Sequence, residues 1–268
     1  MRKVTVIAVF VILLLTGCAE AKVQPSAGGI GKNLPVTRGQ AVKMLAMSRY
    51  TIDEINALPR EIALDDSDIS NWCDKYINAA HKAGIISGTQ ENTFLQNDTL
   101  TLEQANFILK KASEGRNLVL EYDNADRKKP ISAEVWLQMF DAIKGGAEQR
   151  EIVILADKKT CPALRDGYVL TSGGLMNSEG VNITEDMLFC GVNAYVRGNC
   201  ILALTDITET EPVLKNVLVK KKENGGVLLG FDGFDMYFPS PSSDIVLEEN
   251  KSYDLKISGG KVIETKQN

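Results

Sequence analysis

The fold of the first half of this chain is decided by the stretch Asn71-Trp72-Cys73-Asp74-Lys75-Tyr76-Ile77-Asn78-Ala79-Ala80-His81-Lys82-Ala83-Gly84-Ile85-Ile86-Ser87-Gly88. Trp72, Tyr76, Ile77 and Ala80 recur at the spacing of one helix face, which predicts an amphipathic helix. Gly84 stands where a residue in the left-handed conformation would end that helix. The stretch therefore predicts a helix that packs on one face and then turns back sharply.

The same helix-start signal occurs three times around this stretch. Thr37, Thr101 and Ser132 each precede a run with apolar residues at helical spacing, and a hydroxyl at that position caps free backbone N–H groups. The predicted apolar faces are Ala41, Val42, Leu45 and Ala46; then Leu102, Ala105, Ile108 and Leu109; then Val135, Trp136, Met139, Phe140 and Ile143. Residues 34–146 are therefore predicted to form a helical domain.

After Gly146 the period of the apolar residues changes from 3.6 to 2, which is typical of strands. The predicted strands are 151–156, 167–171, 192–196, 201–205, 217–221, 227–231, 235–238, 252–257 and a final one beginning at 261. Gly198-Asn199 predicts a two-residue hairpin turn in which Arg197 faces Cys200. Residues 150–268 are thus predicted to be a small all-β domain, a barrel or a sandwich, and the fold class is α+β with two domains.

The N-terminus combines an export signal with a cysteine. Arg2 and Lys3 precede an apolar run of 12 residues, which is shorter than the roughly 20 that a membrane-spanning helix needs. The end of residues 1–18, Leu15-Thr16-Gly17-Cys18, resembles the lipobox of bacterial lipoproteins. That resemblance implies lipidation of Cys18 and anchoring to the outer face of the cell membrane. Residues 19–33 are small, polar and glycine-rich, which predicts a flexible tether.

Composition excludes several classes of partner. Apolar residues make up 44% and charged residues 24% of the chain, as in ordinary globular proteins. The net charge is −5, and removal of a signal that carries Arg2 and Lys3 would make the mature chain more acidic. This charge disfavours nucleic acid and anionic lipid surfaces as partners.

The cysteines and the lone histidine favour neither a metal site nor catalysis. Besides Cys18 the chain has Cys73, Cys161, Cys190 and Cys200, an even number that leaves disulfides open. The hairpin register keeps Cys190 and Cys200 apart, so buried free thiols are favoured. His81 is the only histidine, and zinc-ligand spacing, the Gly-x-Ser-x-Gly motif and a phosphate loop are missing from the sequence. We expect no metal, no cofactor and no enzymatic activity.

The helical region resembles the S-layer homology family. The resemblance rests on Leu64-Asp65-Asp66-Ser67, Trp72, the turn at 83–88, Thr93-Phe94 and the capped helix at Leu100-Thr101. It covers residues 64–113 as one clear repeat, and residues 34–49 and 130–143 resemble parts of two others. Such units bind secondary polysaccharides of the Gram-positive cell wall, so the resemblance implies a wall-binding protein of the cell surface.

Two residues are candidates for ligand binding. The capped helix of the family begins Thr-Arg-Ala-Glu, and Thr37-Arg38-Gly39-Gln40 keeps the arginine, whereas Leu102 and Ala133 replace it in the other units. A guanidinium forms two parallel bonds to a carboxyl or pyruvyl group, although Arg38 as a solvated first-turn residue is the alternative. Trp72 is either a sugar-stacking residue or part of the core. Asp65, Asp66 and Asp68 lack the glycine and glutamate of a calcium loop, which favours helix capping.

The β region resembles the N-terminal portion of clostridial stage II sporulation D and amidase-enhancer proteins. The residues that carry this resemblance are Lys129-Pro130-Ile131-Ser132 and the hairpin 192–205. Positions matching the catalytic acids of that family are lacking, so no activity is carried over. The sequence thus predicts a non-catalytic protein that binds wall polysaccharide or peptidoglycan or positions a wall hydrolase. The alternatives are an accessory role in peptidoglycan remodelling and a protein-interaction module.

Overall fold

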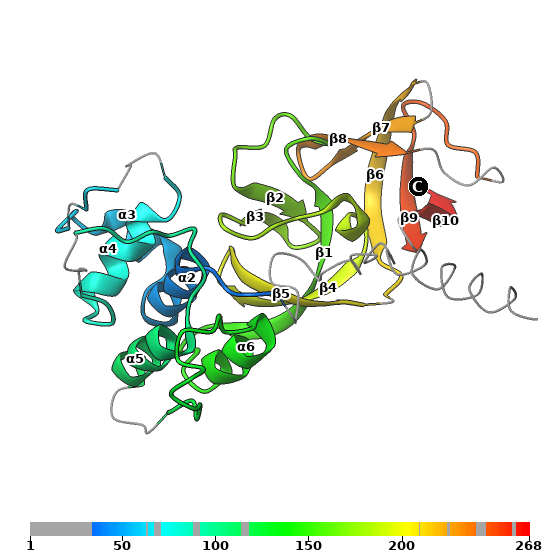
Figure 1. Cartoon of the computed structure of the whole chain (residues 1–268). Helices are drawn as coiled ribbons and strands as arrows, with labels where there is room; N and C mark the ends of the chain where they lie inside the picture. Colours follow the sequence, from blue (N-terminus) through cyan, green and yellow to red (C-terminus); the bar gives the residue numbers. More distant parts are fainter. Residues whose placement is uncertain are drawn as a thin grey trace, which may run out of the picture.

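The structure is a computed structural model that describes residues 34–62, 64–66, 71–87, 92–113, 118–208, 210–223, 226–239, 245–258 and 261–268. The predicted lipidation site at Cys18 and the tether at 19–33 lie outside these residues. Helices occupy the first part of the chain and strands the rest, so the α+β class is confirmed (Figure 1). Over the described ranges, the helices are all too short or too polar to cross a membrane.

The first part of the chain, which we call the helical unit, has five helices in the described residues. They are α2 (Arg38–Arg49), α3 (Ile52–Ala57), α4 (Asp74–Lys82), α5 (Leu102–Ala112) and α6 (Ala133–Asp141). The hydroxyls of Thr37, Thr101 and Ser132 accept hydrogen bonds from the third backbone N–H of α2, α5 and α6, as predicted. Gly84 follows α4 with a φ of 69°, the predicted left-handed conformation. The short helix α3 is not among the predicted elements.

The three capped helices begin at a closed ring of backbone hydrogen bonds. Val36 N–H donates to the carbonyl of Ile131 at 3.1 Å, Ile131 to Leu100 at 2.9 Å, and Leu100 to Val36 at 2.8 Å. Each of these residues lies two positions before the first residue of its helix. The pseudo-repeats seen in the sequence therefore meet around one approximate threefold axis rather than stacking in a line.

The first five strands form a closed barrel in the order β1-β2-β3-β5-β4. Their bounds are β1 (Glu148–Ala156), β2 (Tyr168–Thr171), β3 (Gly174–Asn177), β4 (Gly191–Arg197) and β5 (Cys200–Thr208). Arg197 pairs with Cys200 across the predicted hairpin, and Gly191 pairs with Thr208, so Cys190 and Cys200 are kept apart. All four cysteines after Cys18 are free thiols, and Cys190 is only partly buried. The strand β3 was not predicted because its four residues include no β-branched or aromatic side chain.

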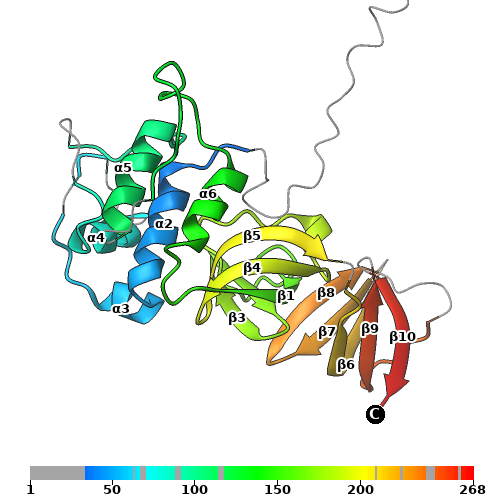
Figure 2. The ribbon, with the colours of Figure 1, turned by 90° about the horizontal axis from the view of Figure 1, so that it is seen from below.

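The remaining strands form a separate sheet in the order β10-β9-β6-β7-β8. They are β6 (Val213–Glu223), β7 (Gly226–Phe231), β8 (Phe234–Pro239), β9 (Ser252–Ser258) and β10 (Lys261–Gln267). The prediction of a single barrel or sandwich is therefore corrected to a barrel followed by a second sheet (Figure 2). The alternating pattern identifies strands, but which strands pair is decided by contacts between segments far apart in the sequence.

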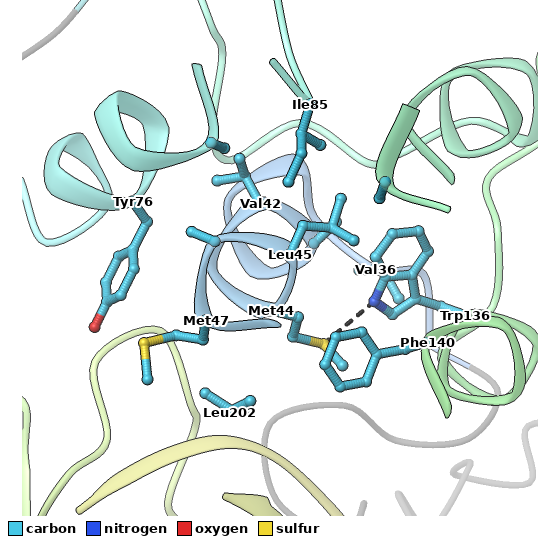
Figure 3. Close-up of a cluster of buried hydrophobic side chains, with 14 of the residues drawn as sticks. Val36, Val42, Met44, Leu45, Met47, Tyr76, Ile85, Trp136, Phe140 and Leu202 are labelled. Atoms are coloured by element: carbon cyan, nitrogen blue, oxygen red, sulfur yellow. Dashed lines mark hydrogen bonds between the residues drawn. The ribbon is translucent and has the colours of Figure 1, made fainter. Parts of the chain in front are cut away.

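The hydrophobic cores do not follow the predicted boundary at residues 146–150. One core surrounds α2 and takes in Trp136 and Phe140 from α6 and Leu202 from the barrel (Figure 3). Tyr195 of the barrel belongs to the same core. A second core is shared by the barrel and the second sheet, where the rings of Phe189 and Phe238 lie 4.3 Å apart. The barrel therefore contributes side chains to both cores, because its strands are apolar on the inside and, at β4 and β5, also on the outside.

Candidate functional site

Arg38, the predicted ligand-binding residue, is the first residue of α2. Its guanidinium carbon lies 4.9 Å from the centre of the Phe94 ring, a cation–π geometry. Burial lowers the pKa of the Arg38 guanidinium, and the nearby charges of Asp98 and Asp66 oppose that shift. Among the residues that the structure describes, the Arg38 side chain forms no ion pair. The guanidinium is therefore half-buried with donors available to an anion.

Arg38 lines a pocket of about 330 Å³, which we call the Arg38 pocket. The pocket lies between α2, α5 and residues 86–87 and 93–94, and most of its lining comes from the region that resembles an S-layer homology repeat. Its wall is largely apolar and includes Val42, Leu64, Ile86, Phe94, Phe107 and Ile108. A concave apolar pocket with a few polar groups at its edge is the usual form of a small-ligand site.

The loop that carries Phe94 is held by Asp66. One carboxylate oxygen of Asp66 accepts from Phe94 N–H at 2.8 Å and the other accepts from Leu95 N–H at 2.6 Å. Leu95 has a φ of 55°, a conformation that non-glycine residues adopt only when held. The expected role of the aspartates in helix capping is therefore corrected, because Asp66 caps loop amides; Asp68 lies outside the described residues. Nowhere in the described ranges do acidic, cysteine or histidine side chains gather into a candidate metal site.

We expect Asp66→Ala to lower the free energy of unfolding by about 2 kcal/mol, because it removes charge-assisted hydrogen bonds from two backbone amides. Urea unfolding followed by circular dichroism measures this change. Asp65→Ala is the matched control, because the Asp65 carboxylate accepts from an exposed side chain, that of Asn92, at 3.0 Å rather than from loop amides. Equal unfolding midpoints for the two variants would contradict the role of Asp66.

The equivalent positions in the other two units lack a cation. Leu102 and Ala133 are the first residues of α5 and α6, and their N–H groups donate to the carbonyls of Lys129 and Leu34 at 2.9 Å, just as Arg38 donates to Asp98. The same backbone hydrogen bond is thus present at all three helix starts, whereas the arginine side chain is present at the first alone. Of the three helix starts, the arginine-bearing one is the candidate for anion binding.

Trp72, the other candidate, lines a different pocket from Arg38. It precedes α4 in a turn, not on the helix, and is half-buried. Its six-membered ring packs against Gly180, where a Cβ would lie 2.3 Å from the nearest ring carbon, and its ring centre is 6.1 Å from that of Tyr76. Trp72 also lines a polar hollow of about 880 Å³ between the helical unit and the barrel, which we call the junction groove. The structure therefore does not bring Trp72 and Arg38 into one site.

A buried polar cluster lies at the junction of the helical unit and the barrel and was not predicted from the sequence. Lys43 of α2 is 1% exposed, and its ammonium donates to the carbonyls of Glu179 and, at 2.6 Å, Ile201. The Glu179 carboxylate in turn pairs with Lys75 at 2.6 Å and accepts from the Tyr76 hydroxyl at 3.1 Å. The one available signal was a lysine inside the otherwise apolar run 41–47. Burial lowers the pKa of Lys43 and raises that of Tyr76.

Arg197 makes a second polar link between the barrel and the helical unit. Its guanidinium donates to the carbonyls of Met47 at 2.5 Å and Arg49 at 3.4 Å, at the C-terminal end of α2 where carbonyls lack helical partners. The Tyr195 hydroxyl donates to the Asp141 carboxylate at 3.2 Å. Together with Lys43, these contacts hold the middle and the C-terminal end of α2 and the end of α6 against the barrel.

One known protein family matches part of the helical unit. Residues 64–105 match the model of the S-layer homology domain. No curated protein and no solved structure matches the chain. S-layer homology domains are non-catalytic modules that typically attach proteins to secondary polymers of the cell wall, so the match indicates a protein of the cell envelope with a wall-binding module. Most residues that line the Arg38 pocket fall in the matched range; those outside it are Arg38, Val42, Ile62, Phe107 and Ile108.

Proposed function

We propose that this protein is a lipid-anchored, non-catalytic protein of the cell surface that binds an anionic cell-wall polymer through Arg38. The observation that carries the proposal is a half-buried guanidinium, without an ion pair in the described residues, that lines a pocket formed largely by the matched S-layer homology residues. A planar guanidinium suits a carboxyl or pyruvyl group because it donates two parallel hydrogen bonds to it. A secondary wall polysaccharide that carries such groups is the proposed ligand.

The surroundings of Arg38 support a fixed orientation of this group. The Phe94 ring lies against the guanidinium, and Asp66 holds the Phe94 loop in place. Asp98 and Asp66 attract the guanidinium from nearby without an ion pair to it. A bound carboxylate would therefore meet an arginine whose position is already restricted, which reduces the entropy lost on binding.

Membrane attachment completes the proposed arrangement. Cys18 would be acylated, and residues 19–33 would let the folded part reach the wall from the outer face of the membrane. The tether has 15 residues and a glycine-rich composition, which suits a flexible spacer. In this arrangement the wall polymer and the lipid hold the protein at two points.

The junction groove is a second candidate contact with the wall. Its lining includes Trp72, Tyr168, Asn182 and Asp166, a mixture of aromatic, amide and acidic groups that suits a neutral glycan or peptidoglycan. Trp72 would present to the ligand the part of its ring that Gly180 does not cover. This contact is secondary to Arg38, because the packing on Gly180 already gives Trp72 a structural role.

We expect Arg38→Gln to weaken binding of the mature chain, residues 19–268, to isolated wall sacculi by about tenfold to a hundredfold. The reason is the loss of two charge-assisted hydrogen bonds, which are the stronger class in proteins. Co-sedimentation with sacculi, before and after acid removal of the secondary polysaccharide, measures the effect. Arg127→Gln is the control. Arg127 is exposed and lies in the segment before α6, which corresponds to the Phe94 segment before α5.

Each result of this assay has a defined meaning. Binding that disappears with the polysaccharide and with Arg38→Gln supports the proposal. Equal binding by Arg38→Gln and the wild type would exclude Arg38, and loss of binding in Trp72→Ala alone would transfer the site to the junction groove. Binding to neither preparation would reject wall attachment.

The resemblance of the β region to amidase-enhancer proteins favours one alternative, an accessory role in peptidoglycan remodelling through a wall hydrolase. Muropeptide release from sacculi separates the two functions. Release by an added amidase that rises with this protein, and does not occur with the protein alone, would support the accessory role. Release by the protein alone would contradict its assignment as a non-enzyme.

A further inference from the structure

The interior of the Arg38 pocket is apolar to a degree that a sugar does not require. Val42, Leu64, Ile77, Ile86, Leu100 and Ile108 contribute aliphatic side chains from three helices and two loops. Burying sugar hydroxyls against these groups would leave them without hydrogen bonds, which costs free energy. The occupant that fits this interior is hydrocarbon.

The polar residues that line the pocket are exposed or half-buried, and they include one cation; we call them the edge of the pocket. Arg38, Ser87, Thr93, Glu103 and Gln104 line it, and Arg38 is the positively charged residue among them. The Lys111 ammonium lies farther along α5, 5.8 Å from the centre of the Phe107 ring. Phe107 also lines the pocket and is 52% exposed, so part of its ring faces solvent.

We propose that the Arg38 pocket binds the acyl chain of an anionic amphiphile, with its carboxylate on Arg38 and its hydrocarbon chain inside. Charge complementarity at the edge and the hydrocarbon wall together select this class over a neutral sugar or a polar peptide. The inference goes beyond wall attachment and does not depend on it, since it concerns the interior of the pocket. The two ligands would share Arg38, so they would compete.

The test is calorimetric titration of the mature chain with hexanoate, octanoate and decanoate below their micelle concentrations. Each added methylene buried in the pocket is expected to tighten binding about fourfold until the pocket is filled. Octanol has a chain of the same length without the charge, and we expect it to bind at least tenfold more weakly than octanoate. Absence of octanoate binding, or affinity that does not change with chain length, would overturn the proposal.

Variants separate the two halves of the site. Arg38→Gln should weaken octanoate about tenfold or more and leave octanol unchanged, with Arg127→Gln as control. Glu103→Gln should strengthen octanoate, because it removes a like charge from the edge. Phe107→Ser should weaken both ligands, whereas Val246→Ser, at a position 71% exposed and outside the pocket, should change neither. Octanoate affinity that Arg38→Gln leaves unchanged would place the carboxylate elsewhere and overturn the proposal.

The failures of the two proposals are distinguishable. Wall co-sedimentation that survives in a chain unable to bind octanoate would reject the acyl ligand and leave wall attachment standing. Octanoate binding in a chain that does not bind sacculi would reject wall attachment and leave the acyl ligand standing. If both ligands bind, decanoate should release the protein from sacculi, and Arg38→Gln should weaken both.

Discussion

Lys43→Ala is expected to lower the free energy of unfolding by about 3 to 5 kcal/mol, because an unsatisfied buried acceptor costs about 1 to 3 kcal/mol and a cavity adds to that loss. The substitution leaves the carbonyls of Glu179 and Ile201 without their donor and opens a cavity at the junction. It also removes one positive charge near the Glu179 carboxylate. Among the described residues, the Lys75 ammonium then remains as the ion-pair partner of Glu179. Urea unfolding followed by circular dichroism measures the loss.

Two further variants assign the cause of that loss. Lys43→Met keeps most of the side-chain volume, so it should recover the cavity cost while the two carbonyls stay unpaired. Lys110→Ala is the control, because Lys110 is an exposed residue of α5 and its loss should change stability by no more than about 0.5 kcal/mol. If Lys43→Ala unfolds like Lys110→Ala, the ammonium does not join the helical unit to the barrel.

Trp136→Ala is expected to cost about 3 to 5 kcal/mol, the usual range for deleting a fully buried aromatic side chain. Trp136 has no exposed surface, and its indole N–H donates to the Met44 sulfur at 3.2 Å in the centre of the core around α2 (Figure 3). The core includes Tyr195 and Leu202 of the barrel, so the barrel should be destabilised together with the helices.

The remaining tryptophan makes this coupling measurable. The chain has two tryptophans, so in the Trp136→Ala variant the fluorescence comes from Trp72, which packs on Gly180 at the junction. We expect its fluorescence and the helical circular dichroism to change at the same urea concentration, as in a single cooperative transition. Phe107→Ala is the matched control, since its ring is half exposed. Loss of helical signal before any change in Trp72 fluorescence would show that the junction opens separately.

Local signals in the sequence predicted most of the elements. Helix starts at Thr37, Thr101 and Ser132 depend on one side chain and the next few backbone amides, so they are legible in a short segment. The hairpin at Gly198 likewise follows from two turn residues. The strand β3 was missed because its residues, Gly174 to Asn177, include no β-branched or aromatic side chain, and the helix α3 because six residues give too few helical periods to identify.

The candidate site was predictable only in part. Arg38 was found from its resemblance to the S-layer homology motif, and the structure places it at a pocket within that module. The pocket itself was not predictable, because its walls come from segments between residues 38 and 108 that meet only in the folded chain. Trp72 was assigned to the face of α4, yet it lies before that helix and contacts Gly180, more than a hundred residues away.

The helical and β regions, the helix caps and the hairpin register could all be predicted from the sequence. So could the position of Arg38, the arginine that is kept at one of the three helix starts. These features depend on neighbouring residues and on the periods 3.6 and 2. The tertiary structure decided the ring of three helix starts, the separation of a barrel from a second sheet, the depth of the Arg38 pocket and the burial of Lys43. Each of these arises from contacts between distant segments. Lys43 in particular is stable in the core only because carbonyls 136 and 158 residues away accept its hydrogen bonds.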